Sequence, residues 1–131
     1  MTDLHPGLKG HAETVVSPSN TADAVGSGLV PVFATPYMIA LMEGAAVNAV
    51  LPCLDADEGT VGTHLDVAHS AATPIGIKVW AEATLTAVDG KKLTYDVVAF
   101  DEVGEIGRGT HERFVIKPER FLAKVQGRLA R

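Results

Sequence analysis

The chain has 131 residues, a formal net charge of −5 and 47% hydrophobic residues, of which few are aromatic. This length is typical of one domain, so we expect residues 1–131 to form a single domain. The negative charge argues against a nucleic-acid partner. The slightly positive mean hydropathy favours a surface that is buried against a second copy of the chain.

The sequence also indicates a compartment. Cys53 is the single cysteine, so no disulfide can form within the chain, as is typical of a reducing cytoplasm. The first residues lack the basic and apolar segments of a signal peptide, and we expect residues 1–7 to be loosely ordered. Glu43 interrupts the longest apolar run, so no membrane-spanning segment is expected. We therefore expect a cytoplasmic protein without membrane contact.

The first part of the chain is organised around one long apolar helix. Residues 8–17 predict a strand, and the turn-rich residues that follow leave room for a short helix at 21–25. The long helix is expected at residues 36–51, with Thr35 as its N-cap, Pro36 at the first helical position and Pro52 after its end. Because Glu43 is its only carboxylate and the rest is nearly free of charge, the helix should be buried.

The second part of the chain predicts four strands, at residues 59–71, 77–88, 91–101 and 105–116. Asp89-Gly90 predicts a two-residue hairpin turn between the second and third of them. Residues 117–131 predict an amphipathic helix. Seven of the eleven cations lie in the last 24 residues, where they either bind an anionic ligand or cover a solvated helix face.

This order of elements predicts an α+β fold in which a curved antiparallel meander wraps one long central helix, followed by a C-terminal helix. That arrangement is a hot-dog fold. A small sheet of this kind has an exposed edge, which pairing with a second copy would cover.

Strand alternation points to one group of reactive side chains. In residues 59–71 it places Gly62, His64, Asp66 and Ala68 on one face and His69 on the other, together with Val61, Thr63, Leu65 and Val67. The face with His69 is apolar and should point at the central helix, within reach of Glu43 or Thr35. These three side chains would form an acid–base–nucleophile set. The alternative is a core histidine paired with Glu43, with Thr35 acting only as a cap.

Other candidate residues carry weaker signals. His64 and Asp66 face away from His69, so this stretch offers no convergent metal ligands, and we expect no metal site. Cys53 has no histidine near it in the sequence and is interpreted as a small buried residue.

Two further positions each allow two interpretations. Gly62 indicates either close approach by a ligand or a β-bulge. Arg113 alternates against Glu112 and Phe114, and it binds an anion or makes a surface ion pair. His111 shares the face of Arg113 and is assigned no role.

Three separated motifs resemble the fluoroacetyl-CoA thioesterase family of hot-dog proteins, over the chain from about residue 30 to residue 121. They are Phe-Ala-Thr-Pro-Tyr-Met at 33–38 followed by Glu43, the run at 58–69, and Arg-Gly-Thr-His-Glu-Arg-Phe at 108–114. The resemblance implies a catalytic set of Thr35, Glu43 and His69, with Gly62 and Arg113 near the acyl group and the thioester. It also implies a homodimer that binds acyl-CoA at the subunit interface, with no cofactor beyond the coenzyme A of the substrate.

The implied reaction is hydrolysis of an acyl-CoA thioester to a carboxylic acid and free CoA. His69 would be general base and acid. Glu43 would be either the nucleophile or the base that activates water, and Thr35 would either position the substrate or attack it. Residues 25–30 lack the phenylalanine that the family carries before the central helix, so selectivity for the fluorinated substrate is not implied. The alternatives are a hot-dog hydratase acting on an enoyl thioester and a non-catalytic acyl-CoA-binding module.

Overall fold

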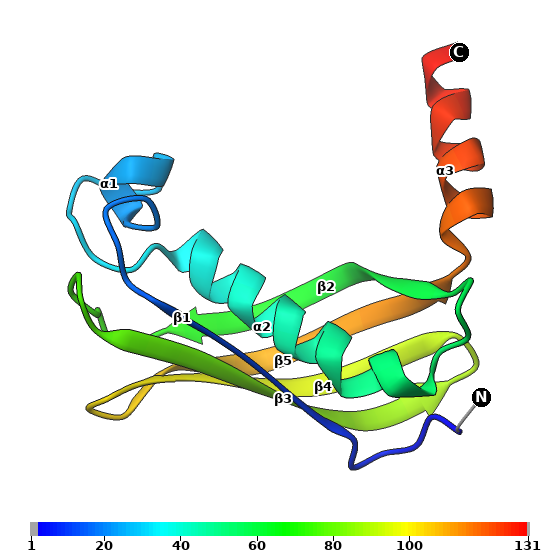
Figure 1. Ribbon diagram of the computed structural model, residues 1–131, viewed down its shortest axis with the longest axis horizontal. Helices are drawn as coiled ribbons and strands as arrows, with labels where there is room; N and C mark the ends of the chain where they lie inside the picture. The colour runs from blue at the N-terminus through cyan, green and yellow to red at the C-terminus, as the bar shows by residue number, and fades with distance from the viewer. Residues whose placement is uncertain (1–2, 131) are drawn as a thin grey trace.

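A computed structural model describes residues 3–130 as an antiparallel sheet wrapped around one long helix (Figure 1). The α+β expectation is therefore confirmed. The helices and strands are β1 (Lys9–Val15), α1 (Ala22–Val25), α2 (Thr35–Val50), β2 (Gly59–His69), β3 (Lys78–Asp89), β4 (Lys92–Asp101), β5 (Glu105–Ile116) and α3 (Pro118–Gln126). Two short 3-10 turns, η1 (Leu51–Cys53) and η2 (Gly127–Ala130), follow α2 and α3.

The sheet departs from the expected four-strand meander. Its strand order is β1-β3-β4-β5-β2, so β3, β4 and β5 form a meander while β2 pairs with β5 and not with β3. The reason lies in α2, which carries the chain across one face of the sheet before β2 begins (Figure 1). β2 therefore joins the edge opposite β1, and residues 70–77 return the chain to β3.

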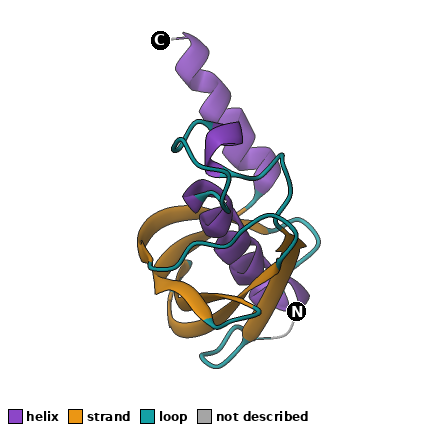
Figure 2. Cartoon of the chain, turned by 90° about the vertical axis from the view of Figure 1, so that its left-hand side faces the viewer, coloured by secondary structure: helices purple, strands orange, loops and turns teal. Residues whose placement is uncertain are grey.

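One side of α2 forms the core of the molecule. Met38, Met42 and Val50 are fully buried against the sheet, which curls around the helix (Figure 2). The other side is open in the single chain, where Tyr37 is 42% exposed, so α2 is not buried all round as expected. The segment Thr35–Cys53 is also long and apolar enough to cross a membrane by composition, but here it packs on a sheet as a core helix.

The two ends of the chain behave differently from each other. Leu4 packs against the core and the Gly7 N–H donates to the Leu85 carbonyl at 2.7 Å, so the loose N-terminus expected for residues 1–7 is wrong for this part. Residues 1–2 lie outside the described residues. The amphipathic helix expected at 117–131 is present as α3 and η2, with Arg131 outside the described range. α3 projects away from the sheet and contains no buried residue (Figure 1).

Candidate active site

Thr35 and His69 meet at the N-terminal end of α2. Thr35 Oγ1 lies 2.8 Å from His69 Nδ1, and His69 is the last residue of β2. Ala34 occupies the N-cap position, so the expected capping role of Thr35 is wrong and its hydroxyl is directed to the imidazole. Burial lowers the pKa of His69, which keeps the ring neutral and able to accept a proton. Its Nε2 is buried and has no hydrogen-bond partner among the described residues.

This pair stands on the wall of a hollow of about 230 Å³. Ala22, Val32 and Phe33 line its apolar side, and residues 70–72 close it beyond His69. Ser27 also lines the hollow, which places the glycine-rich segment 26–28 at its rim. A hydroxyl and a neutral imidazole beside a small space with both apolar and polar walls provide a nucleophile and a general base for acyl transfer.

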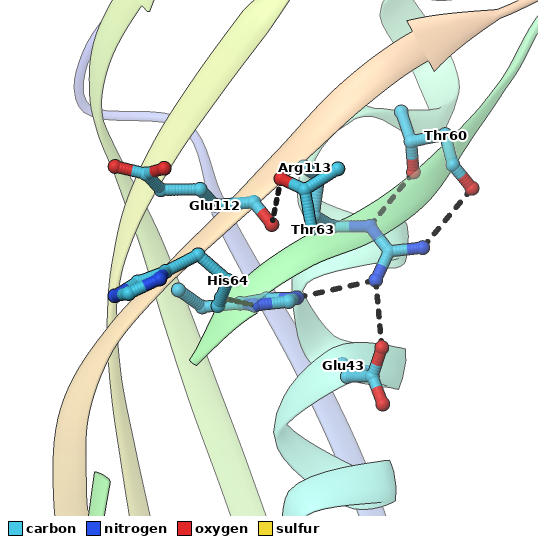
Figure 3. A network of polar contacts seen from close by, with 7 residues as sticks. Glu43, Thr60, Thr63, His64, Glu112 and Arg113 are labelled. Carbon is cyan, nitrogen blue, oxygen red and sulfur yellow. Dashed lines mark hydrogen bonds and ion pairs between the residues drawn. The ribbon is translucent and has the colours of Figure 1, made fainter. Parts of the chain in front are cut away.

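Glu43 lies in a second polar cluster, two turns further along α2. Its Oε2 accepts a hydrogen bond from Arg113 Nη1 at 3.1 Å, and Figure 3 shows the guanidinium pointing from β5 toward this carboxylate. Arg113 Nε donates to Thr60 Oγ1 at 2.9 Å, and Nη2 donates to the Thr60 carbonyl at 3.0 Å. The side chain of Arg113 is 6% exposed and that of Glu43 36% exposed, so the pair is accessible from the carboxylate side. This is an inward-facing ion pair, not the surface pair that the sequence allowed.

Gly62 makes the approach of Glu43 possible. A Cβ at this position would lie 2.7 Å from Glu43 Oε2 and 3.2 Å from Arg113 Nη1. The register of β2 against β5 shifts between Gly62 and His64, which makes Thr63 a bulge residue. The β-bulge is therefore confirmed beside Gly62, at Thr63, whereas close approach by a ligand stays a prediction.

The bulge corrects the expected alternation of β2. Gly62 pairs with Arg113, and His69 pairs with Gly107, so both face the interior of the molecule. Simple alternation had placed Gly62 on the face opposite His69, because it counts every residue and cannot register an extra one. Val61 pairs with Phe114 on the outer face, so it does not share the face of His69 as expected.

The two clusters are separate within one chain. Thr35 and Glu43 are eight residues apart on α2, which corresponds to about 12 Å along the helix axis. His69 is bonded to Thr35, and Glu43 is bonded to Arg113, so the expected direct pairing of Glu43 with His69 is not found in the single chain.

The weaker candidates do not join either cluster. His64 and Asp66 pair with Glu112 and Thr110 on the outer face, away from His69. Within residues 3–130, no group of three or more His, Cys, Asp or Glu residues is arranged to hold a metal ion. Cys53 is buried in η1.

Sequence reasoning missed His111, which lies in the Arg113 cluster. Its Nε2 is 3.2 Å from Arg113 Nη1, and its Nδ1 is 2.7 Å from the His64 carbonyl. The available signal was its shared face with Arg113, two residues away on β5.

Comparison with solved structures defines the class of protein. A variant of the fluoroacetyl-CoA-specific thioesterase FlK matches with a TM-score of 0.91 and 40% identity, covering 98% of this chain and 99% of that chain. A thioesterase superfamily member of Thermus thermophilus matches with a TM-score of 0.87 and 30% identity over 99% of this chain and 98% of that one. The fold and the site thus define a hot-dog acyl-CoA thioesterase, as the sequence predicted.

The family follows from sequence comparison. The family model of the fluoroacetyl-CoA-specific thioesterases matches residues 16–119. A fluoroacetyl-CoA thioesterase of Streptantibioticus cattleyicolor is 52% identical over 95 residues, which cover 72% of this chain and 68% of that protein. The chain belongs to the fluoroacetyl-CoA-specific thioesterase family, and it is a thioester hydrolase.

Proposed function

We propose that this thioesterase acts as a homodimer in which Thr35, His69 and Glu43 carry the reaction and Gly62 and Arg113 shape the site. The observation that carries the proposal is the 2.8 Å contact between Thr35 Oγ1 and His69 Nδ1 at the wall of the hollow. A threonine hydroxyl is a weak nucleophile, and an adjacent neutral imidazole is the base that activates it.

The proposed reaction begins at Thr35. His69 takes the hydroxyl proton as the Thr35 oxygen attacks the thioester carbonyl carbon, and the carbon–sulfur bond then breaks. The departing CoA thiolate receives the proton from His69 and leaves as a thiol. A water molecule then attacks the carbonyl carbon of the ester on Thr35 and gives a proton to a base. The bond from this carbon to the Thr35 oxygen breaks, the base returns the proton to that oxygen, and the carboxylic acid leaves. We assign this second base to Glu43.

Glu43 can reach the same substrate only from a second copy of the chain. β2 is an outer strand of the sheet, and the backbone groups on its free edge are available to pair with another strand. In a two-fold antiparallel pair of β2 strands, the residue numbers of opposed residues have a constant sum. Full overlap of Gly59–His69 with its copy therefore sets His69 opposite Gly59 of the partner subunit.

This pairing brings the two clusters together. His69 and Thr35 of one subunit approach Gly62 of the partner subunit, and with it the partner's Glu43 and Arg113. In this register Gly62 of the partner subunit lies opposite Asp66, three residues or about 10 Å along the strand from His69, whereas Gly62 and His69 are seven residues or about 23 Å apart along β2 of one chain. The open side of α2 supports the same arrangement, because a second copy would cover its exposed apolar residues.

The acyl group that we propose is small and not restricted to the fluorinated one. The curated relative carries fluoroacetyl-CoA in its name, but residues 25–30 of this chain contain no aromatic residue. Leu29 in this segment is 95% exposed, and Gly26 has a φ of +80°, which favours glycine. We propose that this segment is a lid that gates the hollow without an aromatic barrier. The buried, unpaired Cys53 suits the cytoplasm, where we place the protein.

The test is a panel of short, branched, aromatic and halogenated acyl-CoA esters with release of free thiol as the readout. We expect hydrolysis of small acyl groups, and losses of about 10²- to 10⁴-fold in kcat for His69→Ala and Thr35→Ala. Loss of enoyl absorbance without thiol release would instead indicate a hydratase. Recovery of every CoA ester intact would indicate a binding module. Wild-type rates in both variants would overturn the site.

The nucleophile can be identified in Glu43→Gln. If Glu43 activates the second water, this variant should accumulate an acyl ester on Thr35, detectable by mass spectrometry of the intact protein and its peptides. If Glu43 is itself the nucleophile, Thr35 stays unmodified. In that case the acyl group is carried by Glu43 as a mixed anhydride, and water that attacks the Glu43 carbonyl carbon brings ¹⁸O from labelled water into that carboxylate during turnover.

A further inference from the structure

The Arg113 guanidinium is held by three neighbours that fix its orientation. Thr60 accepts from Nε and from Nη2, as described above. The Nη1 group has two N–H bonds, and its two acceptors are Glu43 Oε2 at 3.1 Å and His111 Nε2 at 3.2 Å. An arginine carries five N–H donors, so one on Nη2 has no acceptor among the described residues and is free for a ligand.

His111 can accept this bond only as one tautomer of the neutral ring. Its Nδ1 lies 2.7 Å from the His64 carbonyl oxygen, which has no proton to give, so Nδ1 must carry the hydrogen. Nε2 then presents a lone pair to Arg113. The ring is fully buried and stacks on Tyr95, with the ring centroids 6.1 Å apart, so it has little freedom to turn.

We propose that His111 is a positioning residue of the active site, which aims Arg113 at Glu43 through a neutral, Nδ1-protonated imidazole. His111 does not touch the substrate in this account. Its Nε2 accepts a hydrogen bond from one N–H of Arg113 Nη1, so the second N–H of Nη1 is directed to Glu43. The free N–H of Nη2 then points away from His111. This inference rests on the proposed roles of Arg113 and Glu43.

The surroundings of His111 keep the ring neutral. Burial is the main cause that lowers the pKa of His111, and the Arg113 cation lowers it further. The bond to the His64 carbonyl and the carboxylates of Glu43 and Glu112 act in the opposite direction. Tyr95, packed on the ring from β4, has its pKa raised to about 12 by burial and so carries no charge at neutral pH. Protonation of His111 would remove the acceptor and set a second cation against Arg113.

Two amide substitutions separate the two bonds of His111. In His111→Gln the side-chain oxygen reaches the former Nε2 position and still accepts from Arg113. In His111→Asn the amide nitrogen still donates to the His64 carbonyl, but no atom reaches Arg113. We expect His111→Gln to stay within about threefold of wild-type kcat and His111→Asn to lose about 10- to 100-fold in kcat with little change in KM. His11→Gln, on an exposed part of β1, controls for loss of a histidine.

A second measurement does not depend on activity. In ¹⁵N spectra of labelled imidazoles, His111 should be protonated at Nδ1 and unprotonated at Nε2 at neutral pH. A protonated Nε2 would overturn the proposal, as would His111→Asn with the same kcat as His111→Gln. Arg113→Ala distinguishes the positioning role of His111 from the proposed role of Arg113 on which it rests. If Arg113→Ala keeps wild-type kcat, the role of Arg113 fails. If Arg113→Ala is inactive and a folded His111→Asn is fully active, the positioning role alone fails.

Discussion

At the scale of single residues, one missing methyl group allows the Glu43–Arg113 pair to form beside β2. In Gly62→Ala the new Cβ would lie 2.7 Å from Glu43 Oε2, closer than a carbon and an oxygen can approach. The carboxylate must move, and we expect kcat to fall at least about tenfold, with about 1–3 kcal/mol lost from the free energy of unfolding. Thiol release and urea unfolding measure the two effects.

Gly59→Ala is the matched control, because it adds the same methyl group to the same strand. Its Cβ would meet only the Pro118 ring, at an ordinary distance of 3.5 Å. We expect near wild-type activity. Equal activity in the two variants would show that Gly62 does not need to be small.

Two histidines, His111 fully buried and His69 partly buried, should make the stability of the protein depend on pH. Burial lowers the pKa of both His69 and His111 in the folded state, whereas the unfolded chain titrates near 6.5. Below pH 6.5 the unfolded chain therefore binds more protons than the folded one, and the free energy of unfolding falls as pH decreases toward the folded pKa values. Above pH 6.5 this contribution is fully present. Urea unfolding across pH 5–8 measures how steeply the free energy of unfolding changes with pH. This dependence should be weaker in His111→Gln, and an unchanged dependence would contradict the assignment.

The residues that the sequence singled out are those whose signal is local, and their catalytic roles stay predictions. Each of Thr35, Glu43 and His69 carries a hydroxyl, carboxylate or imidazole that lies within an otherwise apolar stretch. The partner of Glu43 was wrong, because Arg113 comes from a strand 70 residues away. The predicted outward direction of Gly62 was also wrong, because a bulge at Thr63 shifts the alternation by one residue. The glycine indicated a possible bulge but not which residue is the extra one.

At the scale of elements, the helices and strands were predictable to within a few residues, and the pairing of β2 was not. Periodicity and the Asp89-Gly90 turn define where β3 and β4 begin and end. They say nothing about which edge β2 joins, because that depends on how far α2 carries the chain before β2 starts. The route of β2 nevertheless decides the site, since it sets Gly62 beside Arg113 and leaves a free strand edge.

The packing of β1 on α2 leads to a prediction about stability. Gly10 of β1 lies against the helix backbone, and a Cβ there would be 2.0 Å from the Ala45 carbonyl oxygen. The helix cannot yield locally, so we expect Gly10→Ala to lower the free energy of unfolding by about 3 kcal/mol or more. Thermal and urea unfolding measure this change.

Gly44→Ala adds a methyl group at the same interface, but here we expect stabilisation and not destabilisation. Its Cβ would meet Ala12 Cβ at 3.6 Å, an ordinary contact, and alanine is favoured over glycine inside a helix by about 1 kcal/mol. We therefore expect Gly44→Ala to stabilise the protein by about 0.5–1 kcal/mol. If Gly44→Ala destabilised the protein as much as Gly10→Ala, the packing of α2 on β1 would differ from that described.

At the scale of the whole molecule, several features of the single chain are uncovered. β2 has a free edge, α2 has an open side, and α3 stands away from the sheet with Leu122 56% exposed. Each would be unfavourable in an isolated subunit, and a symmetric pairing through β2 would address the first two together. The proposed dimer would also account for the division of the candidate residues into two clusters, since neither cluster alone holds a nucleophile, its base and the second carboxylate.

A shared site predicts complementation between two inactive variants. His69→Ala damages one cluster and Glu43→Gln the other, so a mixed dimer keeps one site in which both residues are intact. After subunit exchange of equal amounts, half of the dimers are mixed and each has one working site, which gives about a quarter of wild-type thiol release. Mixing Glu43→Gln with Arg113→Ala is the control. Both changes fall in the same cluster, so every site of that mixed dimer is damaged, and no activity should return. If the first mixture also stays inactive although mass spectrometry shows mixed dimers, Glu43 and His69 of the same chain act together.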